Sequence, residues 1–189
     1  MNQQTIQKAV SLLKQGEVII TPSESSYGLT CDATNQEAIN KIHKIKQEPS
    51  DKPLIIAISN LDQLSQLKTI ISEETKTLSK SFHPGQLNVI IPTTDNKTIA
   101  FRIPNNKILQ QLSQELNKPL TTTSANLHGQ PPIYKLDELE KQFQTNVSLI
   151  IESGDLDQNT PPSTIYDTIN KKVLREGLIT EEQIKEKLK

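Results

Sequence analysis

The sequence has few aromatic residues, and this absence limits how the protein can bind a ligand. Aromatic side chains make up 3% of the 189 residues, and tryptophan is absent. Proteins that hold single-stranded nucleic acids use aromatic side chains as stacking platforms, so base stacking is not expected to be the main binding device. The hydrophobic share is 33%, which indicates a core built from Ile, Leu and Val.

Glycine and histidine are also scarce, and their spacing excludes several common sites. The glycines are Gly16, Gly28, Gly85, Gly129, Gly154 and Gly177. They spell neither a P-loop nor a dinucleotide-binding fingerprint, so a bound phosphate would be held mainly by Lys and Arg side chains and by Ser and Thr hydroxyls. The histidines lack the spacing of zinc ligands and no Gly-x-Ser-x-Gly elbow exists. We expect no protein-ligated metal centre.

Charge and cysteine content favour a cytoplasmic enzyme that acts on small molecules. The formal net charge is −1, whereas an autonomous nucleic-acid binder usually carries a strongly basic patch. Tight autonomous binding of nucleic acid is therefore not expected. The lone Cys31 excludes an internal disulfide, which suits a reducing compartment; its side chain is either a small buried hydrophobe or a nucleophile. The polar segment 1–8 resembles no signal peptide, and the sequence shows no membrane span.

Hydrophobic periodicity predicts an α/β fold. Helices are predicted around residues 6–13, 34–45, 61–67, 72–80, 108–116, 136–143 and from 180 onwards. Strands are predicted at 18–20, 54–58, 87–91, 99–103, 120–123, 147–151, 164–166 and 173–174. Thr34 with Glu37, and Thr180 with Gln183, are predicted capping boxes. Because strands cluster in the second half, we expect a twisted mixed sheet. Residues 153–162 are predicted to form an exposed loop.

Four polar segments lie at the ends of predicted strands. They are residues 22–28, 46–53, 121–126 and the pair Ser163 and Arg175. Ligands of open α/β sheets bind at strand ends, so these segments are expected to converge. Plainer alternatives remain, because Ser- and Thr-rich loops are often turns and a lysine run is often a solvated helix face. Arg102 and Arg175 lie in strand-like segments, where each requires either an internal Asp or Glu or a carboxylate or phosphate ligand.

Taken together, these segments resemble the YrdC-like family of threonylcarbamoyl-AMP synthases. TPSESSYGLTCDATN resembles the family's P-T-E-[ST]-x-Y-G-L segment, and KIKQEPSDKPLIIAI resembles K-x-R-x-x-x-K-P-L. HPGQLNVIIP resembles P-G-P-x-T, FRIP resembles the R-x-P strand, and TTTSANLHGQPP resembles S-x-S-A-N-x-S-G-x-P. PSTIYD and LREG complete the order. Any one motif is weak, but seven in the correct order through nearly the whole chain are highly specific.

The resemblance implies both a fold and a reaction. The fold would be one YrdC-like domain over residues 1–189, with a twisted mixed sheet and flanking helices around a concave, positively lined cavity. The reaction would join L-threonine, bicarbonate and ATP into threonylcarbamoyl-AMP and pyrophosphate, for the threonylcarbamoyladenosine (t6A) modification of tRNA. Mg²⁺ would accompany ATP through the phosphates. A separate tRNA threonylcarbamoyl transferase complex would take the product through a transient contact.

Carried over position by position, the resemblance also implies residue roles. The threonine pocket would be lined by Ser23, Arg102, Thr122 and Ser163. ATP would be bound by Lys46, Ser50, Lys52, Asn88, Ser124, Asn126, Pro132 and Arg175. Catalysis would depend on Lys46, Lys52 and Arg102. Attack of a carbamate oxygen on the α-phosphate needs positioning and cations rather than a protein nucleophile, which suits the residue types present.

The chain departs from the family pattern at several positions. Glu48 stands where the family has arginine, and its alternatives are to point away, to pair with Lys46 or Lys52, or to bind Mg²⁺. A carboxylate about 4 Å from a phosphate would cost about 4 kcal/mol at an effective dielectric of ~20. Ser23 for threonine keeps the hydroxyl and is a mild departure; the others are Gln86 for proline, Asn88 for threonine and His128 for serine. Two other functions therefore stay open: a non-catalytic nucleotide- or RNA-binding module, and carbamoyl transfer as in hydrogenase maturation factors.

Overall fold

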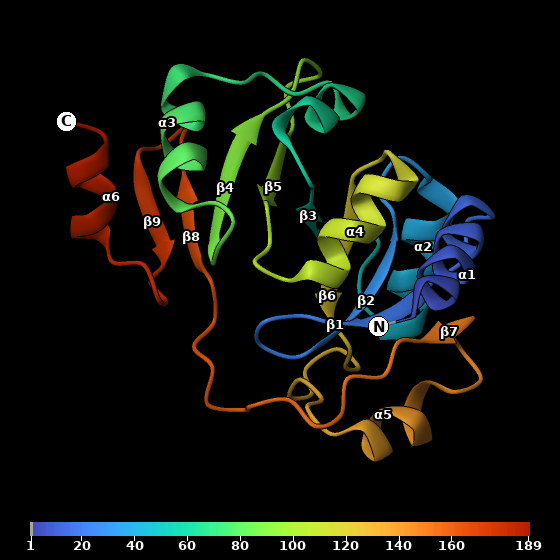
Figure 1. Cartoon of the computed structure of the whole chain (residues 1–189). Coiled ribbons are helices and arrows are strands. Elements are labelled where there is room, and N and C mark those ends of the chain that lie inside the picture. Colours follow the sequence, from blue (N-terminus) through green and yellow to red (C-terminus); the bar gives the residue numbers. More distant parts are fainter. Residues whose placement is uncertain (1) are drawn as a thin grey trace.

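A mixed β-sheet forms the centre of the protein (Figure 1). The computed structural model describes residues 2–189, apart from the side chain of residue 140. These residues form nine strands: β1 (Ile19–Pro22), β2 (Tyr27–Asp32), β3 (Ile55–Ala57), β4 (Leu87–Pro92), β5 (Thr98–Arg102), β6 (Leu120–Ser124), β7 (Leu149–Ile150), β8 (Thr164–Asp167) and β9 (Lys172–Arg175). Their order in the sheet is β7-β1-β2-β6-β3-β5-β4-β8-β9. The pairs β1/β7, β3/β5 and β4/β8 are parallel and the other neighbours antiparallel, which confirms the mixed sheet.

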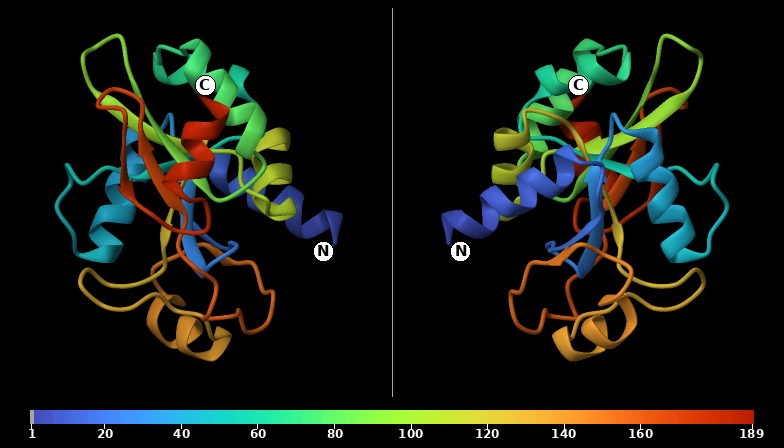
Figure 2. Two further views of the ribbon diagram at one scale, coloured as in Figure 1. Left: turned by 90° about the vertical axis from the view of Figure 1, so that its left-hand side faces the viewer. Right: turned by 90° about the vertical axis from the view of Figure 1, so that its right-hand side faces the viewer.

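Helices flank this sheet on several sides (Figure 2). They are α1 (Gln3–Lys14), α2 (Gln36–Lys46), the 3₁₀ helix η1 (Leu61–Leu67), α3 (Glu73–Phe82), α4 (Lys107–Leu116), α5 (Leu136–Phe143) and α6 (Glu181–Lys187). Every helix and strand predicted from periodicity is present, and residues 153–162 are an irregular, mostly exposed segment as expected. None of the helices in the described part of the chain is both long and apolar enough to cross a membrane.

Two local predictions need correction. The sequence pattern did not predict strand β2, which pairs with β1 and β6 in the middle of the sheet. The predicted capping box of Thr34 and Glu37 is wrong, because Asn35 is the N-cap of α2 and accepts from the backbone N–H groups of Glu37 and Ala38. Thr34 instead donates its hydroxyl to Asp32 over 2.6 Å. The other predicted capping box, Thr180 with Gln183, is confirmed at the start of α6.

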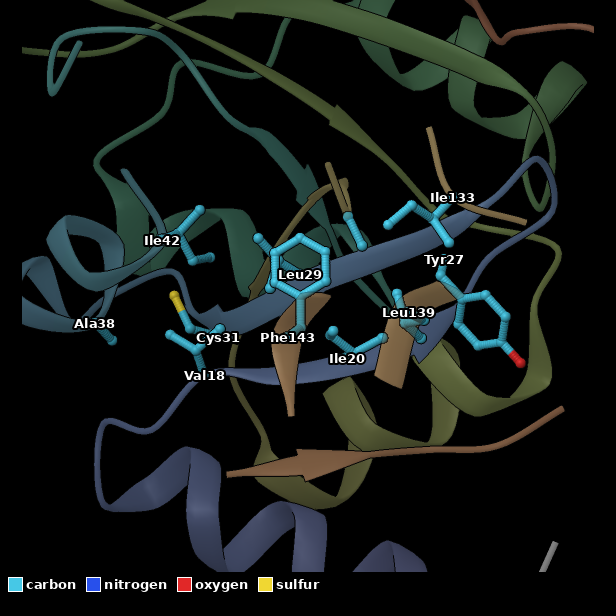
Figure 3. Packing of buried hydrophobic residues seen from close by; sticks show 11 residues of the cluster. Val18, Ile20, Tyr27, Leu29, Cys31, Ala38, Ile42, Ile133, Leu139 and Phe143 are labelled. Carbon is cyan, nitrogen blue, oxygen red and sulfur yellow. The ribbon is translucent and has the colours of Figure 1, made fainter. Parts of the chain in front are cut away.

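Three hydrophobic clusters join the helices to the sheet. Helices α1 and α4 pack on it through Leu13, Leu112, Ile19 and Leu120. Helices α3 and α6 cover β4 and β5 through Leu78, Ile184, Val89 and Phe101. Figure 3 shows the third cluster, where α2 and α5 contribute Ala38, Ile42, Leu139 and Phe143 beside Ile20 and Leu29 of the sheet. These clusters confirm that aliphatic residues make up most of the core.

Cys31 belongs to the third cluster as a buried hydrophobe. Its side chain is fully buried, and burial raises the pKa of the thiol to about 12. A thiol with such a pKa stays protonated at neutral pH and is a poor nucleophile. Of the two alternatives for this residue, the structure therefore supports the small packed side chain.

His83 is held neutral beneath the sheet, and this makes the fold sensitive to acid. Its Nε2 donates to the Leu87 carbonyl over 2.8 Å, so its Nδ1 is the acceptor for Ser79 Oγ at 3.0 Å. Burial, and then the charge of Arg102, lower the pKa of His83 to about 4 from 6.5. Between pH 6.5 and pH 4, His83 is mostly protonated in the unfolded chain but mostly neutral in the native protein.

We therefore expect the free energy of unfolding to fall as the pH drops from 6.5 toward 4. The slope attributable to His83 is about 1.4 kcal/mol per pH unit, and the total is on the order of 3 kcal/mol. Urea denaturation at pH 7 and pH 5 of the wild type and of His83→Gln measures this. In His83→Gln the free energy of unfolding should fall less between pH 7 and pH 5 than in the wild type. An equal fall in the two proteins would contradict the role assigned to His83.

Candidate functional site

A cavity of about 540 Å³ opens on one face of the sheet. Side chains alternate between the two faces along a strand. On β4 and β5, Val89 and Phe101 therefore pack toward α3 and α6, whereas Asn88 and Arg102 line the cavity. On β6, Leu120 packs beneath α1 and α4, and the same face continues to Thr122 and Ser124 in the cavity wall. The cavity thus lies where the helices leave this face of the sheet uncovered.

Most of the residues singled out from the sequence meet in this cavity. Those that line it are Ser23, Lys52, Asn88, Arg102, Thr122, Ser124, Pro132, Ser163 and Arg175. Three others, Lys46, Ser50 and Asn126, are not part of its lining. The polar segments at the strand ends do converge, as expected for a ligand site of an α/β sheet.

Close approach of β2 and β6 shapes one wall. Gly28 faces Ser124 in the strand register. A Cβ atom at Gly28 would lie 3.1 Å from both Thr122 Oγ1 and the Thr123 carbonyl oxygen. A side chain at this position would therefore have to push Thr122 or the β6 backbone back by a few tenths of an ångström.

Arg102 is the most constrained cation of the cavity. Its Nη2 donates to Glu24 Oε2 over 3.0 Å, and its Nη1 donates to Ser163 Oγ over 3.0 Å. The side chains of Arg102 and Glu24 are only 7% and 11% exposed. Nε of Arg102 and Oε1 of Glu24 are buried without a hydrogen-bond partner among the described residues. The internal partner expected as one alternative for Arg102 is thus Glu24, and the pair still has hydrogen-bonding capacity for a ligand.

A second guanidinium lies on the other side of Ser163. Arg175 donates from Nε and Nη2 to the Ser163 carbonyl oxygen, at 3.1 and 2.8 Å. Burial, and then the nearby charge of Arg102, lower the pKa of Arg175. Two guanidinium groups that line one cavity favour an anionic ligand.

Lys46 supports the site from behind the cavity wall. Its Nζ donates to the carbonyl oxygens of Ser124 and Asn126, at 2.6 and 3.0 Å, and to Asn126 Oδ1 at 2.8 Å. Burial lowers the pKa of Lys46 to about 8, yet three surrounding oxygens that each need a donor favour the charged form. In this structure Lys46 fixes the segment that carries Ser124. Its role in binding ATP stays a prediction from the resemblance.

Glu48 points away from the cavity and holds Lys52. Its side chain is fully buried, and its two oxygens meet His43 Nδ1 at 3.2 Å and Lys52 Nζ at 2.8 Å. Lys52 is 45% exposed and lines the cavity. Of the alternatives for Glu48, the structure supports both pointing away and pairing with Lys52. Glu48 is not part of the cavity lining and reaches the cavity only through its ion pair with Lys52.

The sequence did not reveal the contacts that Glu24 and His43 make at this site. Glu24 lies inside the motif TPSESSYGL, but the motif does not say that it pairs with Arg102. His43 was considered only as a zinc ligand, whereas it contacts Glu48. In both cases the spacing of the two residues in the sequence does not indicate that they are in contact.

The residue set also bears on whether Mg²⁺ would be held by the protein. Within the part of the chain that the structure describes, no three His, Cys, Asp or Glu side chains are grouped to hold a metal ion. Among the described residues, the cavity lining offers cations and hydroxyls and includes no Asp or Glu side chain. These residues fit a metal that arrives bound to phosphates.

Comparison with known proteins places the chain in one family. The family model described as telomere recombination, for Sua5, YciO and YrdC proteins, matches residues 11–177. A threonylcarbamoyl-AMP synthase of Pseudoalteromonas translucida is 37% identical over 92% of this chain and 98% of its own length.

Solved structures agree with that placement. P. abyssi Sua5 in complex with L-threonine is 28% identical, with a TM-score of 0.90; the match covers 100% of this chain and 58% of that one. E. coli YciO is 28% identical, with a TM-score of 0.83, over 97% of this chain and 94% of its own. The sequence match and the shared fold show that this protein belongs to the Sua5/YciO/YrdC family.

Proposed function

We propose that the protein is a threonylcarbamoyl-AMP synthase, which joins L-threonine, bicarbonate and ATP and releases pyrophosphate. The observation that carries this proposal is the meeting of Lys52, Arg102 and Arg175 with several hydroxyl groups in one cavity. Relatives that match over nearly their whole length bear the same activity in their names. A solved structure of similar fold was obtained with L-threonine.

The cavity is suited to adenylation without a protein nucleophile. In the proposed reaction a carbamate oxygen on the threonine nitrogen attacks the α-phosphorus of ATP, and the bond to the pyrophosphate oxygen breaks. Mg²⁺ bound to the phosphates would supply further positive charge. The protein's part is to hold both reactants in line and to stabilise the charge that develops, for which fixed cations are effective.

The position of each cation suits it to bind one part of the substrates. Arg102, beside Ser163 and Glu24, offers a buried guanidinium to the threonine carboxylate, which is the role that a planar fork performs best. Arg175 lies on the far side of Ser163, and Lys52 lies at the edge held by Glu48. We assign these two to the phosphates. Ser23, Thr122, Ser124 and Pro132 complete the walls.

The alternatives left by the sequence are less well supported. The non-catalytic module was suggested by a carboxylate next to the phosphates, but Glu48 does not line the cavity. Carbamoyl transfer has no comparable support in the names of the relatives that match most of this chain. We propose further that Mg²⁺ enters with ATP and that a tRNA threonylcarbamoyl transferase complex in the cytoplasm takes the product. The test of the function is whether pyrophosphate release from ATP requires both L-threonine and bicarbonate.

A further inference from the structure

Thr164 lies just outside the cavity and holds the turn that follows β9. Strand β9 ends at Arg175 beside the start of β8, and the chain then turns into α6 (Figure 1). The Thr164 hydroxyl accepts from the backbone N–H groups of Gly177 and Ile179, at 2.9 and 3.1 Å, and donates to the Ile179 carbonyl oxygen over 2.6 Å. A hydroxyl has one donor and two acceptor lone pairs. This side chain, which is 0% exposed, therefore uses all of its hydrogen-bonding capacity on one turn.

Gly177 brings the same turn against the backbone that carries Ser163. A Cβ atom at Gly177 would lie 2.0 Å from the Pro162 carbonyl oxygen and 2.9 Å from the Ser163 carbonyl carbon. Both distances are far below the roughly 3.5–4.0 Å of a favourable non-bonded contact. Only a residue without a side chain allows this approach. We call the contacts of Thr164 and of the 162–163 backbone with residues 177–179 the Thr164 clamp.

The segment held by the clamp contacts both guanidinium groups of the cavity. The Ser163 carbonyl oxygen accepts from Nε and Nη2 of Arg175, and the Ser163 hydroxyl accepts from Nη1 of Arg102. Two bonds to one oxygen fix the plane of the Arg175 guanidinium, and an arginine has five N–H donors, so others are left for a ligand. The position of the Ser163 backbone therefore sets where Arg175 presents its charge.

Resting on the proposed function, we propose that the Thr164 clamp positions Arg175 for the phosphates of ATP. Neither Thr164 nor Gly177 lines the cavity, so both are positioning residues that act through Ser163 and Arg175. The turn also leads into α6, whose Ile184 packs in the core. A clamp that served only to hold α6 would matter for stability alone, whereas a clamp that positions Arg175 also matters for binding of ATP.

Two substitutions break the clamp by different routes. Thr164→Val keeps the shape of the side chain but removes its hydrogen bonds to the turn. Gly177→Ala keeps those bonds, but its methyl group pushes the Pro162 carbonyl oxygen away and displaces Ser163. We expect each change to raise the Kd for ATP at least about tenfold, because a charged hydrogen bond to the phosphates is lost or misaligned. Thr164→Ser retains the hydroxyl and should bind ATP like the wild type.

The experiment is calorimetric titration of these variants with ATP and Mg²⁺, alone and combined with Arg175→Ala, beside urea denaturation. Because the clamp acts through Arg175, Thr164→Val and Gly177→Ala should add little to the effect of Arg175→Ala on the Kd. Thr168→Val is the matched control. Thr168 is a buried threonine just past the other end of β8, donates to the Ile90 carbonyl oxygen over 2.7 Å and does not line the cavity. This control should unfold at a lower urea concentration and bind ATP like the wild type.

The outcomes separate this inference from the proposed function. Clamp variants that lose stability but bind ATP like the wild type would overturn the inference, and so would an equal rise in Kd with and without Arg175→Ala. If Thr164→Val does not fold, Gly177→Ala makes the same comparison. A wild type that binds ATP but releases no pyrophosphate with L-threonine and bicarbonate would overturn the proposed function, while the titrations still measure the coupling of the clamp to Arg175. A wild type that binds no ATP would overturn both.

Discussion

Arg102→Ala is expected to lower kcat/KM for L-threonine at least about hundredfold. Truncating one partner of a buried charged hydrogen-bonded pair costs about 2–5 kcal/mol, and each 1.4 kcal/mol is a factor of ten. The Arg102 side chain is only 7% exposed, so water cannot replace it. Steady-state pyrophosphate release at varied L-threonine and saturating ATP measures the effect.

This variant needs a control for folding, because Arg102→Ala also leaves Glu24 without its partner. Arg102→Lys keeps a positive charge for Glu24 but removes the planar fork that holds a carboxylate by two bonds. We expect Arg102→Lys to unfold like the wild type, to show a raised KM for L-threonine, and to keep its KM for ATP. A folded Arg102→Lys protein with an unchanged KM for L-threonine and a raised KM for ATP would place Arg102 in the nucleotide site instead.

Glu48→Arg is expected to lower the free energy of unfolding by about 3–5 kcal/mol, although arginine is the residue in the family pattern. The Glu48 side chain is 0% exposed and lies between His43 and Lys52. Arginine there would bury an unpaired cation beside Lys52 and near Lys46, whose charge Glu48 now offsets. Removing one partner of a buried ion pair costs this much because an uncompensated charge remains.

Urea denaturation of the wild type, Glu48→Arg and Glu48→Gln measures the effect. Glu48→Gln keeps the shape and one hydrogen bond to each neighbour, so the expected loss is about 1 kcal/mol. Lys52 loses its ion pair in both variants, but at 45% exposure it is solvated by water. A Glu48→Arg protein as stable as the wild type, with raised activity, would show that the side chain turns into the cavity and that the family's arginine role is restored.

The sequence was a good guide to elements with a strong repeating pattern. The helices with a long apolar stripe, such as Lys107–Leu116, were predicted close to their bounds. Tyr27, Leu29 and Cys31 alternate with Gly28, Thr30 and Asp32, which is the period of a strand. Strand β2 was missed because its start was assigned to the polar segment 22–28. Its full burial comes from pairing on both sides in the sheet, which no local pattern reports.

The orientation of Glu48 shows why other parts of the site could not be predicted from the sequence. Helix α2 ends at Gln47 in the left-handed conformation, with φ of 54°. This turn brings the Glu48 N–H to the His43 carbonyl oxygen over 3.1 Å and tucks its side chain beside the helix. Glycine is the usual residue at such a position, so a glutamine gives no warning of the turn. Sequence order alone suggested that Glu48 lies among the residues expected to bind phosphates, whereas the backbone turn takes its side chain out of the cavity lining.

The twelve predicted site residues fall into those that line the cavity and those that do not. Those on the strands and their ends, such as Arg102 and Thr122, line the cavity because strand alternation fixes which face they take. Lys46 and Asn126 bond to each other behind the wall, and Ser50 is exposed on a turn. Which of these contact ATP stays a prediction from the resemblance.

The most direct test of the central claim is the fate of labelled bicarbonate. The wild-type protein is incubated with ATP, Mg²⁺, L-threonine and ¹³C-bicarbonate, and the adenylate product is analysed by mass spectrometry. We predict a threonylcarbamoyl adenylate that carries the label, formed together with pyrophosphate, and neither product when L-threonine or bicarbonate is omitted. Pyrophosphate release that needs neither compound, or no labelled adenylate from a folded protein that binds ATP, would contradict the assignment.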